Sequence, residues 1–117
     1  MGQNIVINGE VEKGYYNGNF SIIGETINLC EHPQEFKGCI AITDKPRFEL
    51  IRIPYLKAVI IDKCSALNHV MVTLRERGIP VIRNTDLKAS EIIKSGFKIQ
   101  VRVLSGKVIL LRGYEND

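Results

Sequence analysis

The sequence predicts a single small domain of the mixed α/β class. Three short apolar runs, residues 39–43, 58–61 and 81–82, are typical of buried strands and alternate with stretches of helical spacing. Two later runs, residues 98–103 and 107–111, are separated by a glycine-containing turn and predict a closing hairpin. A chain of 117 residues can bury one hydrophobic core, so we expect one domain over the whole chain.

The remaining elements follow from turn and capping signals. Shorter strands are expected at residues 5–7 and 25–29, where glycines mark the neighbouring turns. Three helices are expected between the strands, each bounded by a cap, glycine or proline signal: Pro46 to Pro54, His69 to Gly78, and Asn84 or Thr85 to Gly96. Residues 113–117 are expected to be a loose tail.

The composition is that of a globular protein and argues against a membrane-spanning or secreted one. The chain is 44% hydrophobic and 25% charged, as in ordinary soluble globular proteins. No apolar run approaches the roughly 18 residues of a membrane span, and no secretory signal opens the chain. We therefore expect a cytoplasmic protein without a membrane partner.

Charge is unevenly distributed along the chain. Residues 1–44 hold two basic and six acidic side chains, a net −4, whereas residues 45–117 hold fourteen basic and seven acidic ones, a net +7. The basic residues alternate with apolar ones and match no nucleic-acid-binding motif, so no nucleic-acid partner is expected. The bias indicates either a solvated basic face or a surface that attracts anionic ligands or an acidic partner domain.

The cysteines and histidines do not form a metal motif. Cys30, His32, Cys39 and Cys64 are four potential ligands, but no Cys-x-x-Cys pair is present. His32 precedes a proline in a loop-like segment and is expected to face solvent. An odd number of cysteines without a secretory signal also argues against a disulfide framework. No metal site is expected.

His69 is the most informative single residue. It follows the apolar run 58–61 and a short loop, and it precedes apolar residues at helical spacing. We expect it to be exposed in the first turn of a helix, where unpaired backbone N–H groups and the helix dipole favour an anion and disfavour the imidazolium. A histidine that accepts a phosphoryl group needs both properties, whereas the ordinary role of such a histidine is a surface or capping one.

The segment from Cys64 to Pro80 resembles the phosphohistidine motif of the mobile, or swivelling, domain of phosphoenolpyruvate-utilising enzymes. His69 matches the phosphorylated histidine of the motif, Arg75 its arginine, and residues 78–80 its closing Gly-Ile-Pro. The resemblance extends from Gly38 to the closing hairpin, about two thirds of the chain. It implies a layered β/β/α fold of the swivelling phosphohistidine type.

The sequence departs from that motif just before the histidine. Cys64 and Ser65 replace two glycines, Leu67 replaces a threonine, and Asn68 replaces a serine. Glycines allow close approach of backbone to phosphate, and hydroxyl groups donate hydrogen bonds to it. The resemblance therefore implies an intact scaffold with an altered phosphate pocket.

By this resemblance the chain is a phosphoryl carrier and a phosphotransferase component. His69 is then the phosphoryl acceptor, and Ser65, Asn68 and Arg75 bind phosphate. The chain has no nucleotide-binding loop of its own, so Mg²⁺ with ATP or phosphoenolpyruvate is assigned to partner domains that bind nucleotide and phosphoenolpyruvate or pyruvate.

Two alternatives remain beside the carrier. One is a non-catalytic swivelling module for docking or regulation, in which His69 is only a helix-end residue. The other is a small subunit of another enzyme with a swivelling domain, such as a dehydratase, against which the histidine-centred motif argues. The sequence does not identify a phosphoryl donor or acceptor.

Overall fold

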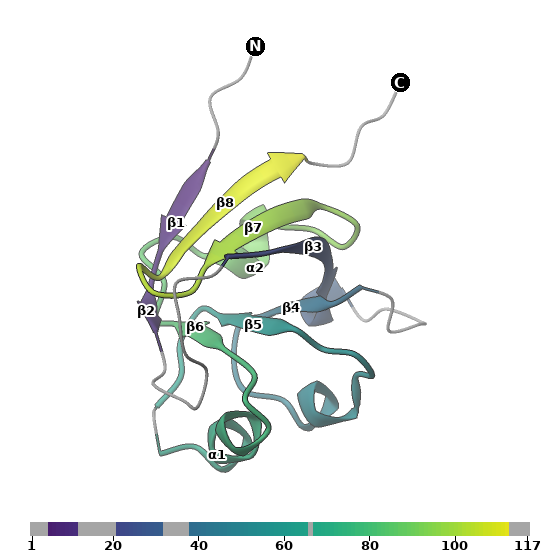
Figure 1. Ribbon diagram of the computed structural model, residues 1–117, viewed down its shortest axis with the longest axis vertical. Coiled ribbons are helices and arrows are strands. Elements are labelled where there is room, and N and C mark those ends of the chain that lie inside the picture. Colours follow the sequence, from purple (N-terminus) through teal and green to yellow (C-terminus); the bar gives the residue numbers. More distant parts are fainter. Residues whose placement is uncertain (1–4, 12–20, 32–37, 66, 113–117) are drawn as a thin grey trace.

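The computed structural model describes residues 5–11, 21–31, 38–65 and 67–112. They form a small domain of mixed α/β content with two short 3₁₀ helices, η1 and η2 (Figure 1). The elements, in chain order, are β1 (Val6–Asn8), β2 (Glu10–Val11), β3 (Ser21–Asn28), η1 (Leu29–Glu31), β4 (Ile40–Thr43), η2 (Phe48–Arg52), β5 (Ala58–Ile61), α1 (His69–Glu76), β6 (Val81–Arg83), α2 (Ala89–Ile92), β7 (Lys98–Arg102) and β8 (Lys107–Arg112).

The eight strands form one mixed sheet in the order β1-β8-β7-β3-β4-β5-β6-β2. Strands β3, β4, β5 and β6 are parallel, whereas β1, β8, β7 and the first half of β3 pair antiparallel. Strand β3 belongs to both parts, because Ser21–Glu25 pair with β7 and Thr26–Asn28 pair with β4. It therefore carries the chain from one layer of the domain to the other.

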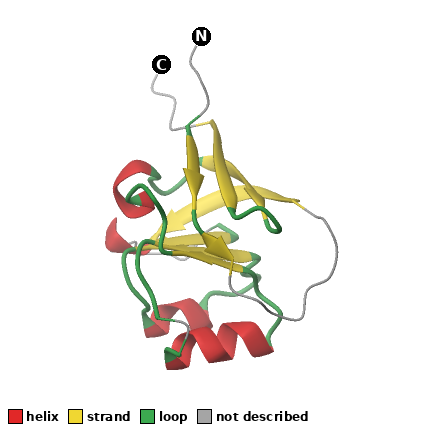
Figure 2. Cartoon of the chain, turned by 90° about the vertical axis from the view of Figure 1, so that its left-hand side faces the viewer, coloured by secondary structure: helices red, strands yellow, loops and turns green. Residues whose placement is uncertain are grey.

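The molecule has three layers and two cores. The antiparallel strands lie above the parallel ones, and α1 lies below them (Figures 1 and 2). The first core fills the space between the two parts of the sheet and includes Ala89 of α2 and the following residue, Ile93. The second core lies under the parallel strands and includes Leu50 of η2 with Met71 and Leu74 of α1. Each parallel strand in the middle is thus covered on both faces.

This double burial explains the apolar runs in the sequence. All four residues of β4 and all four of β5 are buried, and their side chains alternate between the two cores. A parallel strand covered on both faces needs apolar residues at every position, whereas a half-exposed strand alternates. The predicted strands at 39–43, 58–61 and 81–82 are confirmed to within a residue or two at each end.

The predicted helix at His69 is also confirmed. Asn68 is its N-cap, and the Asn68 Oδ1 atom accepts the backbone N–H of Val70 at 2.8 Å. The helix ends at Glu76, and Gly78 follows with a φ of +72°, the left-handed conformation that glycine adopts most easily.

Two predicted helices are shorter than expected. Between Pro46 and Pro54 the chain forms only the five-residue 3₁₀ helix η2, since the two prolines leave no room for a longer one. The helix expected from Asn84 begins only at Ala89. Asn84 itself has a φ of +54°, which is incompatible with a helical position. Strand β2, which pairs with the edge of β6, was not predicted because two residues show no periodicity.

Some expectations fall on residues that are not described. The loose tail at 113–117 and the solvent-facing His32 lie outside the described residues. Among the residues that are described, no helix is long and apolar enough to cross a membrane.

Gly106 and Gly78 offer a matched test of the layered packing. Both have a φ near +70°, so an alanine at either position bears the same backbone strain of roughly 1–2 kcal/mol. A Cβ atom at Gly106 would clash with the carbonyl oxygen of Gly9, whereas one at Gly78 meets nothing within 4 Å. We expect Gly106→Ala to lower the free energy of unfolding by about 1–3 kcal/mol more than Gly78→Ala does, measured by urea denaturation. Equal losses would contradict the close approach of the β7–β8 turn to Gly9.

Candidate functional site

A cleft of about 740 Å³ opens at the carboxyl ends of the parallel strands. Its walls come from the segments that follow β3, β4, β5 and β6, together with α2. In open sheets of parallel strands, ligands bind at this end because the following loops are free to carry polar groups. The lining contains five carboxylates and three lysines: Glu31, Asp44, Asp62, Asp86, Glu91, Lys63, Lys88 and Lys94.

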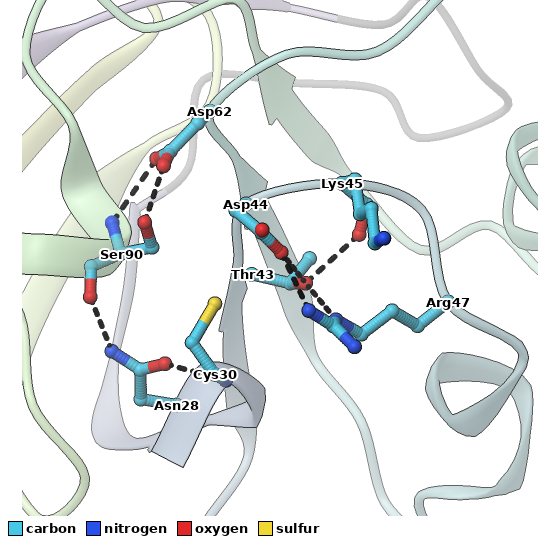
Figure 3. A network of polar contacts seen from close by, with 8 residues as sticks. All are labelled: Asn28, Cys30, Thr43, Asp44, Lys45, Arg47, Asp62 and Ser90. Atoms are coloured by element: carbon cyan, nitrogen blue, oxygen red, sulfur yellow. Dashed lines mark hydrogen bonds and ion pairs between the residues drawn. The ribbon is translucent and has the colours of Figure 1, made fainter. Parts of the chain in front are cut away.

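The floor of the cleft is a buried carboxylate that holds α2 in place. The Oδ1 atom of Asp62 accepts the backbone N–H of Ser90 at 3.0 Å, and its Oδ2 atom accepts the Ser90 hydroxyl (Figure 3). Asp62 is only 8% exposed and Ser90 9% exposed. Lys88, the N-cap residue of α2, provides no side-chain cap. Asp62, the residue that follows β5, caps α2 in its place. Both oxygens of this carboxylate are used in the structure.

A second polar group lies beside it at the end of β4. Arg47 donates from Nη2 to Asp44 at 2.9 Å and from Nε to the Thr43 hydroxyl at 3.1 Å (Figure 3). Partial burial works to raise the pKa of Asp44, but hydrogen bonds from Arg47 and Cys30 outweigh it and hold that pKa below its usual value. Partial burial and the neighbouring Asp44 carboxylate raise the pKa of the Cys30 thiol. Cys30 is therefore a protonated thiol at neutral pH and not an activated nucleophile.

The other carboxylates of the cleft are also engaged. Asp86 accepts the backbone N–H of Asn8 at 2.9 Å and its side-chain amide at 3.1 Å, and these bonds lower the pKa of Asp86. Glu31 accepts the backbone N–H of Ser95 at 2.9 Å, and Glu91 lies 3.8 Å from Lys88. These acidic groups hold the loops of the cleft together.

Two of the three lysines of the cleft, in contrast, are available to a ligand. Lys63 and Lys94 line the cleft, are exposed, and form no ion pair with any described residue. Lys63 and Lys94 are therefore two cations of the cleft that a ligand could engage, beside carboxylates that keep their negative charge. The arrangement is suited to binding a small organic anion, with neutral hydroxyl and thiol groups nearby.

The four residues expected to form a phosphate site do not line this cleft. His69 is exposed at the first position of α1, as expected, and Arg75 is half-buried two turns later. Ser65 and Asn68 use their side-chain oxygens on the nearby backbone N–H groups of Leu67 and Val70. These two polar groups therefore organise the start of α1.

The residues of the cleft were missed by motif matching, although the sequence carries a signal for them. Asp44 directly follows β4 and Asp62 directly follows β5, so each is a charged residue at the end of a buried parallel strand. Their positions predict a shared edge of the sheet. Lys94 and Ser90 had no such signal, because the position of α2 is set by tertiary contacts.

Metal ligation finds no support in the described part of the chain. No group of three His, Cys, Asp or Glu side chains there is placed to hold a metal ion. Cys30 and Cys39 are half-buried, Cys64 is buried, and none of the three is in a disulfide.

Comparison with solved structures identifies a likeness of fold. The chain is similar to aconitase X of Thermococcus kodakaraensis, solved in its holo-form, with a TM-score of 0.63 and 18% sequence identity. The alignment covers 92% of this chain and 99% of that chain. No protein-family model matches the chain, and no curated protein matches it either.

This finding corrects the expectation drawn from the histidine motif. The assignment to the mobile domain of phosphoenolpyruvate-utilising enzymes is wrong, and the phosphoryl-carrier function of His69 has no support. The nucleotide-binding and phosphoenolpyruvate-binding partners, and the transferase class, are wrong with it. The residues that carried the resemblance, such as Ile40–Thr43 and Gly78, are those that build strands and helix ends, so they report the scaffold and not its chemistry.

The ion pair at the end of β4 predicts a pH dependence of stability. The folded protein holds the pKa of Asp44 below its value in the unfolded chain, so the Asp44 carboxylate stabilises the fold above that unfolded value. This contribution is lost as the pH falls through the folded-state pKa. We expect the stability difference between the wild type and Asp44→Asn to be largest near neutral pH and to shrink in acid, measured by urea unfolding.

The effect is small because the Asp44 side chain is 45% exposed, and added salt should reduce it further. In an Arg47→Met background the difference should lose most of its pH dependence. A pH dependence that persists in that background would show that Arg47 is not its cause.

Proposed function

We propose that this chain is the small component of a hydratase of the aconitase type and that its cleft binds the acid substrate of that enzyme. The observation that carries the proposal is the likeness to an aconitase X chain over nearly the full length of both chains. The alignment includes 99% of the aconitase X chain, so the likeness extends over that whole chain and not over one part of it. The dehydratase subunit, which the histidine motif argued against, is thus the alternative that the fold supports.

Two lysines of the cleft support this proposal. Enzymes of the aconitase type remove water from a hydroxy acid, so their substrates carry carboxylates. Lys63 and Lys94 offer two unengaged cations, while the five carboxylates of the cleft are held by protein donors. An acid would therefore meet attraction from Lys63 and Lys94.

The described lining of the cleft offers no hydroxyl or thiol that is prepared to act as the base of a dehydration. Removing water requires a base for a carbon-bound proton and an acceptor for the departing hydroxide. Within the described residues, the Ser90 hydroxyl is donated to Asp62 and the Cys30 thiol is protonated, so neither is such a base. We therefore assign substrate binding to this chain and the bond-breaking step to a larger partner chain.

The partner chain would also hold any cofactor. The similar aconitase X was solved in its holo-form, but in the described part of this chain no three potential metal ligands lie close enough together to hold a metal ion.

The proposal also includes the type of fold: the three layers belong to the swivelling β/β/α type, and residues 1–117 form one domain. It places the protein in the cytoplasm.

The test is reconstitution with the larger chain that the proposal requires, identified as the protein that copurifies with this chain from its native cells. We expect the two chains to form a complex in size-exclusion chromatography with light scattering. We also expect the complex, and neither chain alone, to dehydrate a hydroxy acid, followed by the ultraviolet absorbance of the unsaturated product.

Lys63→Ala and Lys94→Ala should each raise KM about tenfold or more, because each removes a charged contact to the substrate, and should leave the complex intact. Lys57→Ala, at an exposed lysine outside the cleft, is the matched control and should change neither value. Absence of a complex or of dehydration by it would refute the proposed function, and unchanged KM values would refute the role of the cleft.

A further inference from the structure

The antiparallel strands expose a face that no described element covers. This outer sheet face consists of the outward-pointing residues of β1, β8, β7 and β3: Val6, Ile23, Glu25, Lys98, Gln100, Arg102, Lys107, Ile109 and Leu111. Their neighbours along each strand, such as Ile7, Ile99 and Val108, point into the first core. Figure 1 shows these strands as the upper layer of the molecule, with their other side turned toward the parallel strands.

The centre of the outer sheet face is a row of three apolar residues and one glutamine. Ile23 pairs with Gln100, Gln100 with Ile109, and Ile109 with Val6, so one residue from each of the four strands lies in a single register. Directly paired residues have Cβ atoms about 4.5–5.5 Å apart, which makes the row contiguous. Val6 is 40% exposed and Ile23 50% exposed, and Leu111, two residues beyond Ile109, is 40% exposed.

A row of basic residues flanks this central row. Arg102 pairs directly with Lys107, both are exposed, and neither forms an ion pair with a described residue. Like charges directly opposite each other on neighbouring strands are destabilising. On the other flank Lys98 pairs with Glu25, the only acidic side chain among the residues that define this face. Arg102 and Lys107 therefore have no acidic residue of this face opposite them, and an external partner could supply one.

We propose that the outer sheet face docks a protein partner whose surface has an apolar centre and aspartate or glutamate residues opposite Arg102 and Lys107. A second copy of this chain would place basic residues against basic residues. The residues that define the face also include no aromatic side chain, and three of its four apolar residues are β-branched, so the face is poorly suited to inserting into a lipid surface.

This inference rests on the proposed function, which supplies the occupant: the larger hydratase chain. The cleft lies at the carboxyl ends of the parallel strands, whereas the outer sheet face belongs to the antiparallel strands. A partner bound to the face therefore leaves the mouth of the cleft open, and the larger chain must extend around the sheet to bring its reacting groups to a substrate bound there.

The experiment measures binding of the large chain to the wild type and to two variants of the full chain. The double variant Arg102→Glu/Lys107→Glu should weaken binding about tenfold or more and reverse its dependence on salt, and Ile23→Asp should weaken it by a similar factor. Lys57→Glu and Leu67→Asp are the matched controls, since both residues are exposed and lie outside the outer sheet face. Circular dichroism and urea unfolding establish that each variant is folded.

Chemical acetylation of lysines gives a second readout without substitution. In the complex, Lys98 and Lys107 should be protected from acetylation, while Lys57 stays reactive. A wild-type complex that is unaffected by the face variants, with Lys107 still reactive, would overturn this inference and leave the proposed function standing. Absence of any complex would overturn both.

The same variants also test two other occupants of the face, a second copy of this chain and a lipid surface. If the isolated chain forms a dimer that Ile23→Asp dissociates, the face binds a second copy. If it binds phosphatidylserine vesicles and Arg102→Glu/Lys107→Glu abolishes that binding, the face is a lipid-binding surface. Either result would overturn the assignment to an acidic protein partner.

Discussion

The fold depends on a buried amide at the carboxyl end of β3, the strand that the two parts of the sheet share. Asn28, fully buried at the end of β3, donates from Nδ2 to the carbonyl oxygens of Ser90 and Ile93 at 2.8 and 2.7 Å. Its Oδ1 atom accepts the backbone N–H of Cys30 at 2.8 Å. An unpaired buried amide costs several kcal/mol, so these bonds fix α2 against the carboxyl edge of the sheet. Together with the cap from Asp62, they determine the shape of the cleft.

The sequence predicts the parts of this fold that depend on periodicity and local capping. Strands β4 and β5 are buried on both faces and are therefore visible as unbroken apolar runs. Helix α1 is visible because Asn68 caps it and Gly78 ends it within the same short segment. Helix α2 is different, because its cap comes from Asp62, 28 residues earlier in the chain. No local pattern reports such a contact, so the start of α2 was placed too early.

The same distinction explains why the function was predicted wrongly. A motif centred on His69 combines residues with two kinds of role. Gly78 and the apolar residues of α1 are required by any helix that packs on this sheet, whereas the residues just before the histidine would carry the chemistry. In this chain the first kind is present, while Ser65 and Asn68 are bonded to backbone N–H groups. The helix-building residues of the motif therefore predicted the fold class better than they predicted the function.

The charges of the molecule show the same separation between structure and binding. The acidic groups of the cleft have donors within the chain: Asp44 has Arg47, Asp62 has Ser90, and Asp86 has Asn8. The cations of the cleft and of the outer sheet face do not, as Lys63 and Lys107 illustrate among the described residues. Lys63, Lys94, Arg102 and Lys107 are thus cations that form no ion pair with a described residue. An anionic substrate at one edge and an acidic protein on one face would each supply the missing partners.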